Sequence, residues 1–133
     1  MLVGVAEAAG LDEGRLTVVV VDDAQMSDLH RQYKRQDGTT DVLTFDLREP
    51  PGVGSVEADV VVCFDEAVRQ SSAIGHDVRL EVLLYAVHGL LHLIGYDDVD
   101  PTEAERMHRR EDELLVAVGC PAAYAAAGRS RID

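Results

Sequence analysis

The sequence contains no tryptophan, few other aromatic residues and few basic ones. Aromatic side chains make up 5% of its 133 residues, and 12 lysines and arginines stand against 25 aspartates and glutamates, for a formal charge of −13. Such an acidic chain repels nucleic acid and anionic membranes unless basic residues or a metal ion gather at one place. The composition therefore argues against nucleic-acid binding in general, and any RNA site must overcome this charge locally.

Cysteine and long apolar runs are also scarce. The only cysteines, Cys63 and Cys120, lie in apolar or turn-like surroundings, so we expect two reduced thiols, with a single disulfide as the alternative. The longest apolar stretch, residues 83–94, contains two histidines and is too short to span a bilayer. The N-terminus has no basic segment, and Glu7 interrupts its apolar run, so we expect no secretory signal. These absences favour a cytoplasmic protein.

Hydrophobic residues nonetheless make up 47% of the chain, enough for the core of one domain. Apolar runs rich in β-branched residues predict strands, and apolar residues spaced three and four apart predict helices. We expect strands at residues 16–21, 41–47 and 56–63, and helices at residues 2–9, 24–36, 65–74, 77–94 and 101–118. This order predicts an α+β domain or a mixed-sheet α/β domain at residues 1–120, followed by a loosely ordered tail at residues 121–133.

The longest predicted helix carries two histidines four residues apart. On a helix this spacing puts His88 and His92 on one face, separated by a rise of about 6 Å, so both imidazoles can bind one metal ion. Gly95 lets the chain leave the helix, and the following turn can bring the carboxylate of Asp98 back as a third ligand. Three protein ligands leave one position open for water, which is typical of a catalytic metal site.

The alternative is that these are core histidines bonded to backbone carbonyl groups. Most of the helix is apolar, which indicates burial, and its only polar stripe consists of Glu81, Tyr85 and the two histidines. Such a stripe on a buried helix favours the metal site. The other histidines lie among charged residues, and we expect them to be solvated: His30, His76 and His108, of which the last is a reserve ligand on the next helix.

Three segments of the chain carry recognisable motifs. Residues 88–98 read H-G-L-L-H-L-I-G-Y-D-D, residues 29–45 read L-H-R-Q-Y-K-R-Q-D-G-T-T-D-V-L-T-F, and residues 58–63 read A-D-V-V-V-C. Together they resemble the YbeY family of ribosome-associated metalloendoribonucleases. The corresponding family motifs are H-G-x-L-H-L-x-G-Y-D-H, L-N-x-x-Y-R-x-K-D-x-x-T-D-V-L-S-F and G-D-I-V-I-C. The resemblance covers roughly residues 16–120.

The resemblance implies a zincin-like α+β domain with a mixed sheet and a metal site on its central helix. It implies a zinc-dependent endoribonuclease that is directed at single strands and acts in 16S rRNA 3′-end maturation and ribosome quality control. RNA and the ribosome or small-subunit proteins are the expected partners, with no membrane and no DNA. The family's metal ligands fall on His88, His92 and Asp98, and its arginine falls on Lys34, which makes Lys34 a catalytic candidate alongside Asp97. Lys34 keeps the charge but not the bidentate fork for phosphate, for which Arg35 can substitute.

Asp98 stands where the family has a histidine. A carboxylate makes the site less positive, so bound water should be acidified less, and Mn or Mg becomes an alternative to Zn. Asp97 can compete with Asp98 as the ligand. Asp41, Asp59 and Asp97 are all available as a catalytic base, and only its place in the motif favours Asp97. Whether water or the RNA 2′-OH is the nucleophile stays open.

One cluster of basic residues can offset the repulsion between this acidic chain and RNA. Arg31, Lys34 and Arg35 lie at the end of the predicted helix 24–36, and with a metal ion they can create a locally positive site for RNA. A solvated helix face is the alternative interpretation of these residues. The RNA-binding hypothesis therefore rests on Lys34 and Arg35 together with the metal.

Two other functions stay open. The spacing H-x-x-x-H-x-x-G-x-x-D is also that of metzincin peptidases, but those enzymes need glutamate directly after the first histidine, where this chain has Gly89. The other alternative is a non-catalytic ribosome-assembly or protein-binding factor with a degenerate metal site. The departures from the family pattern at Lys34 and Asp98 favour it.

Overall fold

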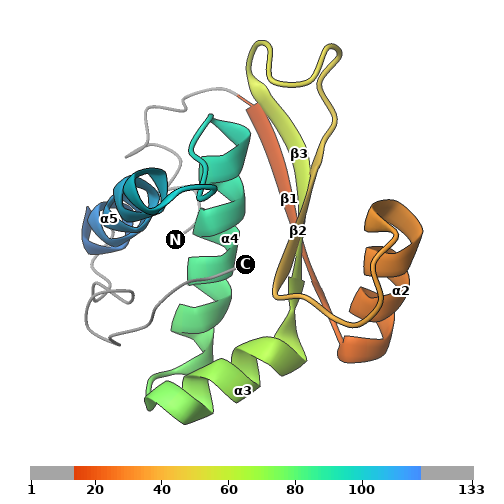
Figure 1. The fold of residues 1–133 in the computed structure, drawn as a ribbon, viewed down its shortest axis with the longest axis vertical. Helices are drawn as coiled ribbons and strands as arrows, with labels where there is room; N and C mark the ends of the chain where they lie inside the picture. Colours follow the sequence, from red (N-terminus) through yellow and green to blue (C-terminus); the bar gives the residue numbers. More distant parts are fainter. Residues whose placement is uncertain (1–13, 118–133) are drawn as a thin grey trace.

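The structure is a computed structural model, and it describes residues 14–117 of the chain (Figure 1). The α+β fold with a mixed sheet is confirmed, and every strand and helix predicted within these residues is present. Along the chain, the elements of the described part are β1 (Gly14–Val21), α2 (Asp23–Lys34), β2 (Val42–Asp46), β3 (Val56–Cys63), α3 (Phe64–Ile74), α4 (Val78–Leu93) and α5 (Pro101–Ala117). The helix expected at residues 2–9, the tail at residues 121–133 and Cys120 lie outside the described residues.

β3 is the central strand of the sheet, whose order is β1–β3–β2. It pairs parallel with β1, where Val18 is opposite Val60, and antiparallel with β2, where Thr44 is opposite the same valine. A short loop can join the antiparallel pair, whereas the parallel pair needs a longer crossover, which here runs through α2 and β2. As a result α2 lies on one face of the sheet, and α4 and α5 lie on the other (Figure 1).

The central strand is buried on both faces because successive side chains point to opposite sides of the sheet. Val60 and Val62 belong to the core formed with α4 and α5, whereas Val61 and Cys63 pack with Met26 of α2. Cys63 is a free, buried thiol, which confirms the prediction for this residue, and burial raises its pKa. None of the helices within residues 14–117 is long and apolar enough to cross a membrane.

α2 ends two residues earlier than predicted. Its N-terminus is closed by a capping box, in which Asp22 accepts a hydrogen bond from the backbone of Gln25 at 2.8 Å and the Gln25 side chain accepts one from Asp22 at 3.1 Å. Its C-terminus is fixed by Arg35, which adopts φ 55° and ψ 36°, a left-handed conformation that ends the helix. This turn leaves Lys34 and Arg35 exposed at the helix end.

Gly89 lets α4 pack closely on the sheet. A Cβ atom added at this position would lie 3.0 Å from Cγ1 of Val60 and 3.4 Å from Cγ2 of Thr44. Real side-chain carbons rarely approach so closely, so a single Cβ atom would require Val60 to shift by a few tenths of an ångström, and a larger side chain would push the helix away from β2 and β3. The glycine therefore sets the distance between the sheet and the helix that carries the histidines.

Replacing Gly89 with valine is expected to lower the free energy of unfolding by about 1–3 kcal/mol, the usual cost of overpacking a core. Gly89→Ala is the matched control, because alanine gains about 1 kcal/mol of helix propensity and adds a single carbon. Urea unfolding of both variants measures the difference. A valine variant as stable as the wild type would contradict this account of the glycine.

Candidate metal centre

The two predicted ligands lie on α4 between the sheet and α5 (Figure 1). His88 is fully buried and His92 is partly buried, and the Nε2 atoms of the two rings are 3.1 Å apart. Two nitrogens that each lie about 2.0–2.1 Å from one tetrahedral zinc ion are separated by about 3.3 Å. The spacing of the two Nε2 atoms therefore fits ligands of a single ion.

The other nitrogen of each ring determines which atoms face the centre. His88 Nδ1 lies 2.5 Å from a carboxylate oxygen of Glu111, and His92 Nδ1 lies 3.2 Å from the carbonyl oxygen of Tyr96. Because both partners are acceptors, each Nδ1 carries the proton and donates it. In neutral rings both Nε2 atoms then present lone pairs to each other, and this arrangement is repulsive unless a cation lies between them.

Asp98 is the carboxylate that joins the histidines. Gly95 adopts φ 103° after α4, and the turn brings Oδ2 of Asp98 to 3.9 Å from Nε2 of His88. One ligand atom from each of His88, His92 and Asp98 lies within 4.8 Å of the other two. Asp97 is exposed, and its Oδ1 accepts a hydrogen bond from the backbone of Asp98 at 2.7 Å. Asp97 thus stabilises the turn that presents Asp98.

The environment of the centre favours an imidazole that is free to bind a metal. Burial lowers the pKa of His92, and the neighbouring His88 lowers it further, against the opposite effect of the Asp98 and Asp97 carboxylates. Neutral imidazole is the form of histidine that binds a metal ion. The donor set of two imidazoles and one carboxylate matches the ligands that zinc takes in catalytic sites.

Two histidines that we expected to be solvated are not. His108 is 5% exposed and its Nδ1 lies 3.2 Å from Glu111, while His76 lies 2.7 Å from the buried carboxylate of Glu81. The prediction for His108 was wrong because the charged residues next to it in sequence do not lie on its face of α5. His76 lies in the turn between α3 and α4, where it meets Glu81. The spacing of His108, Glu111 and Leu115 was the signal that puts all three on the inner face of α5. His30 bonds the backbone oxygen of Gly38 at the surface.

An arginine that sequence reasoning missed forms a wall of the cleft next to His92. Arg48 is 7% exposed, and its guanidinium binds both carboxylate oxygens of Asp46 at 2.8 Å. It also donates to the backbone oxygens of Leu93, at the end of α4, and of Gly54. Arg48 therefore ties the end of β2 and the loop before β3 to the helix end that carries His92. No spacing pattern in the sequence marks this contact.

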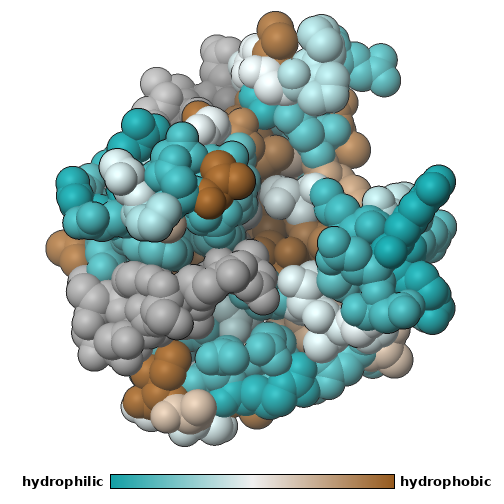
Figure 2. All heavy atoms as spheres, viewed as in Figure 1, coloured by the Kyte–Doolittle hydropathy of each residue, from teal (hydrophilic) through white to brown (hydrophobic). Residues whose placement is uncertain are grey.

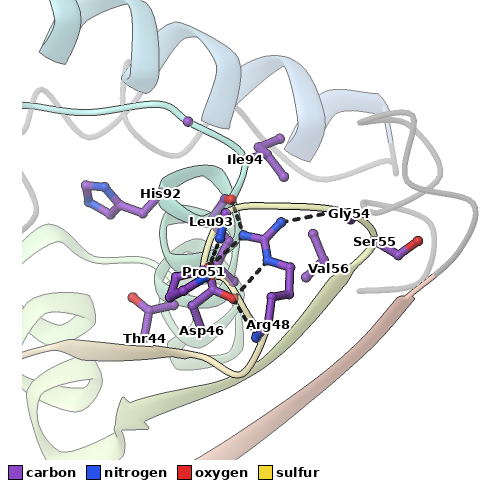
Figure 3. A pocket seen from close by; sticks show the side chains of 12 residues that line it. Thr44, Asp46, Arg48, Pro51, Gly54, Ser55, Val56, His92, Leu93 and Ile94 are labelled. Atoms are coloured by element: carbon purple, nitrogen blue, oxygen red, sulfur yellow. Dashed lines mark hydrogen bonds and ion pairs between the residues drawn. The ribbon is translucent and has the colours of Figure 1, made fainter.

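The cleft has a volume of about 700 Å³, and His92 lies at one side of its labelled lining, near Thr44 (Figure 3). The cleft lies between the end of β2, the loop before β3 and the end of α4. The space-filling view shows hydrophobic side chains in the hollow between α2 and the α4–α5 side of the molecule (Figure 2). A ligand in the cleft would reach His92 along β2. The centre is thus open to solvent on the His92 side and closed behind His88.

Acid should weaken the Asp46–Arg48 contact. The hydrogen bond from Arg48, against the opposing effect of burial, lowers the pKa of Asp46 from 3.8 to about 2. The stabilisation is therefore complete above the ordinary pKa and is lost as the pH falls from about 4 towards 2. We expect the urea midpoint of Asp46→Asn to change less over this range than that of the wild type. Equal changes in both proteins would contradict the assignment.

Lys34 and Arg35 lie apart from the histidines. They end α2, which packs on the other face of the sheet, and neither side chain makes a hydrogen bond or an ion pair with any residue from 14 to 117. Tyr33 packs edge-on against Phe45 of β2, with ring centroids 5.1 Å apart. That contact holds the end of α2, with its basic residues, against β2. Thr44 of the same strand lines the cleft.

The position of the general base in metallopeptidases is taken by a residue that faces the sheet. Gly89 follows His88 directly, and a Cβ atom there would already press on Val60. A glutamate at this place would have no room without displacing β3. The chain therefore lacks both the carboxylate and the space that the peptidase alternative needs.

The fold and the centre together define a class of protein: a small α+β domain whose buried helix and following turn bring two histidines and an aspartate together as candidate metal ligands. The profile of the family described as Endoribonuclease YbeY matches residues 3–119. The chain belongs to the YbeY family.

Named relatives agree with this assignment. The chain is 38% identical to Endoribonuclease YbeY of Anaeromyxobacter dehalogenans, over 92% of this chain and 63% of that protein. It is 41% identical to the protein of that name from Anaeromyxobacter sp. strain Fw109-5, over 84% of this chain and 58% of the other. It is 42% identical to the Endoribonuclease YbeY of Pelotomaculum thermopropionicum, over 83% of this chain and 75% of that protein. The chain thus spans about three fifths of the length of the first two relatives.

A solved structure shows the same fold. The solution structure of a Thermotoga maritima protein superposes with a TM-score of 0.65 and 23% sequence identity, covering 97% of this chain and 85% of that one. At this identity the likeness concerns the arrangement of helices and strands alone. It supports the α+β architecture described above.

Proposed function

We propose that this chain is a metal-dependent endoribonuclease that cleaves single-stranded RNA in the cytoplasm. Its proposed substrate is the 3′ end of 16S rRNA, and its proposed partners are the ribosome or small-subunit proteins. The observation that carries the proposal is the pair of Nε2 atoms of His88 and His92, which face each other 3.1 Å apart while each Nδ1 atom faces an acceptor. The relatives that bear the name Endoribonuclease YbeY supply the reaction.

Zinc is the metal that we propose, with Mn or Mg as alternatives. Imidazole nitrogens suit zinc, whereas magnesium and manganese prefer sites made of oxygen ligands. In this proposal His88 and His92 hold the ion and Asp98 completes the protein ligands. When bound, the ion would supply Lewis-acid activation of the nucleophile and of the scissile phosphate.

The other residues have roles around this centre. Asp97 lies beside Asp98 in the exposed turn, and its carboxylate is the proposed acceptor of the proton that the attacking hydroxyl loses. This holds whether the hydroxyl belongs to water or to the RNA. Arg48 keeps the wall of the cleft in place through its bonds to Asp46 and Leu93. Its guanidinium is already occupied, so we assign it no phosphate.

Lys34 and Arg35 are the proposed phosphate contacts outside the metal centre. Arg31 is paired with Asp28 at 2.7 Å, so the basic cluster expected from the sequence is reduced to the two residues at the helix end. Both are exposed, and Tyr33 holds this end against Phe45, next to the strand that lines the cleft. A single strand that passes His92 could continue towards these cations and so overcome the acidic charge of the chain.

Loss of either cation should weaken RNA binding in a salt-dependent manner. For Lys34→Ala or Arg35→Gly, the slope of log affinity against log salt should become shallower by about 0.7, the value for one phosphate contact to a single strand. Arg35→Gly is informative because glycine tolerates the left-handed φ of 55°, so stability should not fall. Fluorescence anisotropy with a single-stranded oligonucleotide measures the slope. Arg109→Gln, which removes an exposed charge on α5, is the control.

The proposal as a whole is tested by cleavage of a single-stranded RNA oligonucleotide. We expect the zinc-loaded protein to cut it, EDTA to stop the reaction and added zinc to restore it. Metal-independent association with ribosomal particles, without cleavage under any metal, would instead identify the non-catalytic assembly factor. An oligonucleotide cut equally well in EDTA would indicate a contaminating nuclease and would contradict metal-dependent cleavage by this protein.

A further inference from the structure

A buried carboxylate lies behind the histidine pair and has no part in the roles given above. Glu111 is fully buried on α5, whose inner face is otherwise built mainly from apolar residues such as Leu114 and Leu115. One of its oxygens is 2.5 Å from His88 Nδ1 and the other is 3.2 Å from His108 Nδ1. Burying an ionised group costs stability unless it is well partnered, so the position calls for a functional explanation.

A second metal ion is one explanation of this cluster, since His88, His108 and Glu111 bring their ligand atoms close together. The distances argue against it. Two ligands of one zinc ion lie about 3.3 Å apart, whereas His88 Nδ1 and the Glu111 oxygen are separated by 2.5 Å. That separation is typical of a short hydrogen bond from an imidazole N–H to a carboxylate. All three residues are also buried, which leaves no open position for water.

The direction of the hydrogen bond decides what Glu111 does for the metal centre. As an acceptor it keeps the proton on His88 Nδ1, and the lone pair of that ring must then be on Nε2, the atom that faces His92. His92 receives the same orientation from a neutral partner, the backbone oxygen of Tyr96. The charged partner therefore acts on one of the two ligands only.

We propose that Glu111 is a positioning residue of the metal centre: it fixes the orientation and tautomer of His88 and places a buried negative charge behind the ion. His108 completes the arrangement because its N–H binds the second oxygen of Glu111 and holds the carboxylate in line with His88. This inference rests on the proposed metal site. It adds to that site a series of hydrogen bonds that runs from His108 and Glu111 on α5 to His88, which would bind the metal.

The variant Glu111→Gln tests the proposal, because it keeps the size of the side chain and removes its charge. Glu113→Gln is the matched control, since it removes the same charge from the exposed face of the same helix, where Glu113 pairs with Arg110. Zinc affinity is measured by competition with a chromogenic chelator, and Co²⁺ absorption reports the geometry around the ion. Circular dichroism of the metal-free proteins shows whether each variant is folded.

We expect Glu111→Gln to bind zinc about 10–100-fold more weakly than the wild type, the usual cost of losing an outer partner of a metal-bound histidine. Its Co²⁺ bands should shift, while Glu113→Gln should match the wild type in both measurements. Unchanged affinity and bands in a folded Glu111→Gln protein would overturn the inference but leave the metal site standing. Equal losses in both variants would also overturn it, because total charge would then be the cause. A wild type that binds no zinc would remove the proposed function and this inference together.

A second pair of variants decides the matter if Glu111→Gln does not fold. His108→Phe keeps a ring but loses the N–H that holds Glu111, whereas His108→Gln keeps a donor at this place. We expect the phenylalanine variant to bind zinc more weakly than the glutamine variant. Equal zinc affinity of both variants and the wild type would contradict the role proposed for the hydrogen bonds from His108 and Glu111 to His88.

Discussion

Replacing His92 with alanine is expected to remove the metal ion from the protein, and RNA cleavage with it. The wild type should hold about one zinc per chain, because the two Nε2 atoms and a carboxylate oxygen of Asp98 lie close enough together to bind one ion. The variant keeps a single imidazole and one carboxylate, which is too few to retain zinc through purification. Elemental mass spectrometry on protein purified without chelator measures the metal, and a single-strand cleavage assay measures the activity.

His88→Ala should have the same effect on the metal but is the less direct test. Removing His88 leaves the buried carboxylate of Glu111 without its shorter hydrogen bond, so this variant should also be less stable. His30→Gln is the control for the loss of a histidine, since His30 only bonds the backbone oxygen of Gly38 at the surface. Wild-type zinc content and cleavage in a His88→Ala, His92→Ala double variant would rule out this centre as the active site. A wild type that holds neither zinc nor another metal would contradict the proposed metal site.

The second large effect is expected at Asp98. Asp98→Ala should weaken zinc binding by more than the roughly 10–100-fold that follows the loss of an outer partner, because a ligand itself is lost. Asp98→His should instead restore tight binding and give the three-histidine ligand set of the family motif. It should also reduce binding of Mn²⁺ relative to Zn²⁺, since imidazole favours zinc over the harder ion. Competition titrations with both metals measure these changes.

Asp97→Asn is the comparison for these variants. Asp97 is exposed and bonds the backbone of Asp98, and an asparagine side chain can make the same bond. Zinc affinity should therefore stay close to that of the wild type, while cleavage should fall if Asp97 accepts a proton. Loss of zinc in Asp97→Asn but not in Asp98→Ala would make Asp97 the metal ligand and Asp98 the proton acceptor.

The strands and helices within residues 14–117 could be predicted from local patterns. The predicted bounds of β3 agree with the observed ones because a valine-rich run between a glycine-rich loop and a helix is typical of a strand buried on both faces. α5 begins at Pro101 as predicted, where Asp100 accepts a hydrogen bond from the backbone of Glu103 at 2.8 Å. The end of α2 lies two residues before the predicted one, since a left-handed arginine at position 35 is rare and has no sequence signal.

The candidate site could be predicted only where its residues are close in sequence. His88, His92 and Asp98 lie within one helix and the turn after it, so their meeting follows from helix geometry and the glycine between them. Glu111 reaches His88 from another helix, and Arg48 reaches the end of α4 from 45 residues away. No spacing pattern in the sequence predicts either contact, because the first depends on how α5 packs against α4 and the second on how the β2–β3 loop does.

The sequence by itself determined the class of fold, the pair of imidazoles and the carboxylate turn beside them, because short-range spacing and backbone preferences decide these features. It also carried the motifs by which the family can be recognised. Only the tertiary structure decided which nitrogen of each histidine faces the centre, that His108 is buried, and that Arg48 forms a wall of the cleft. These depend on hydrogen bonds between elements far apart in the chain, whose partners are chosen when the sheet and helices pack together.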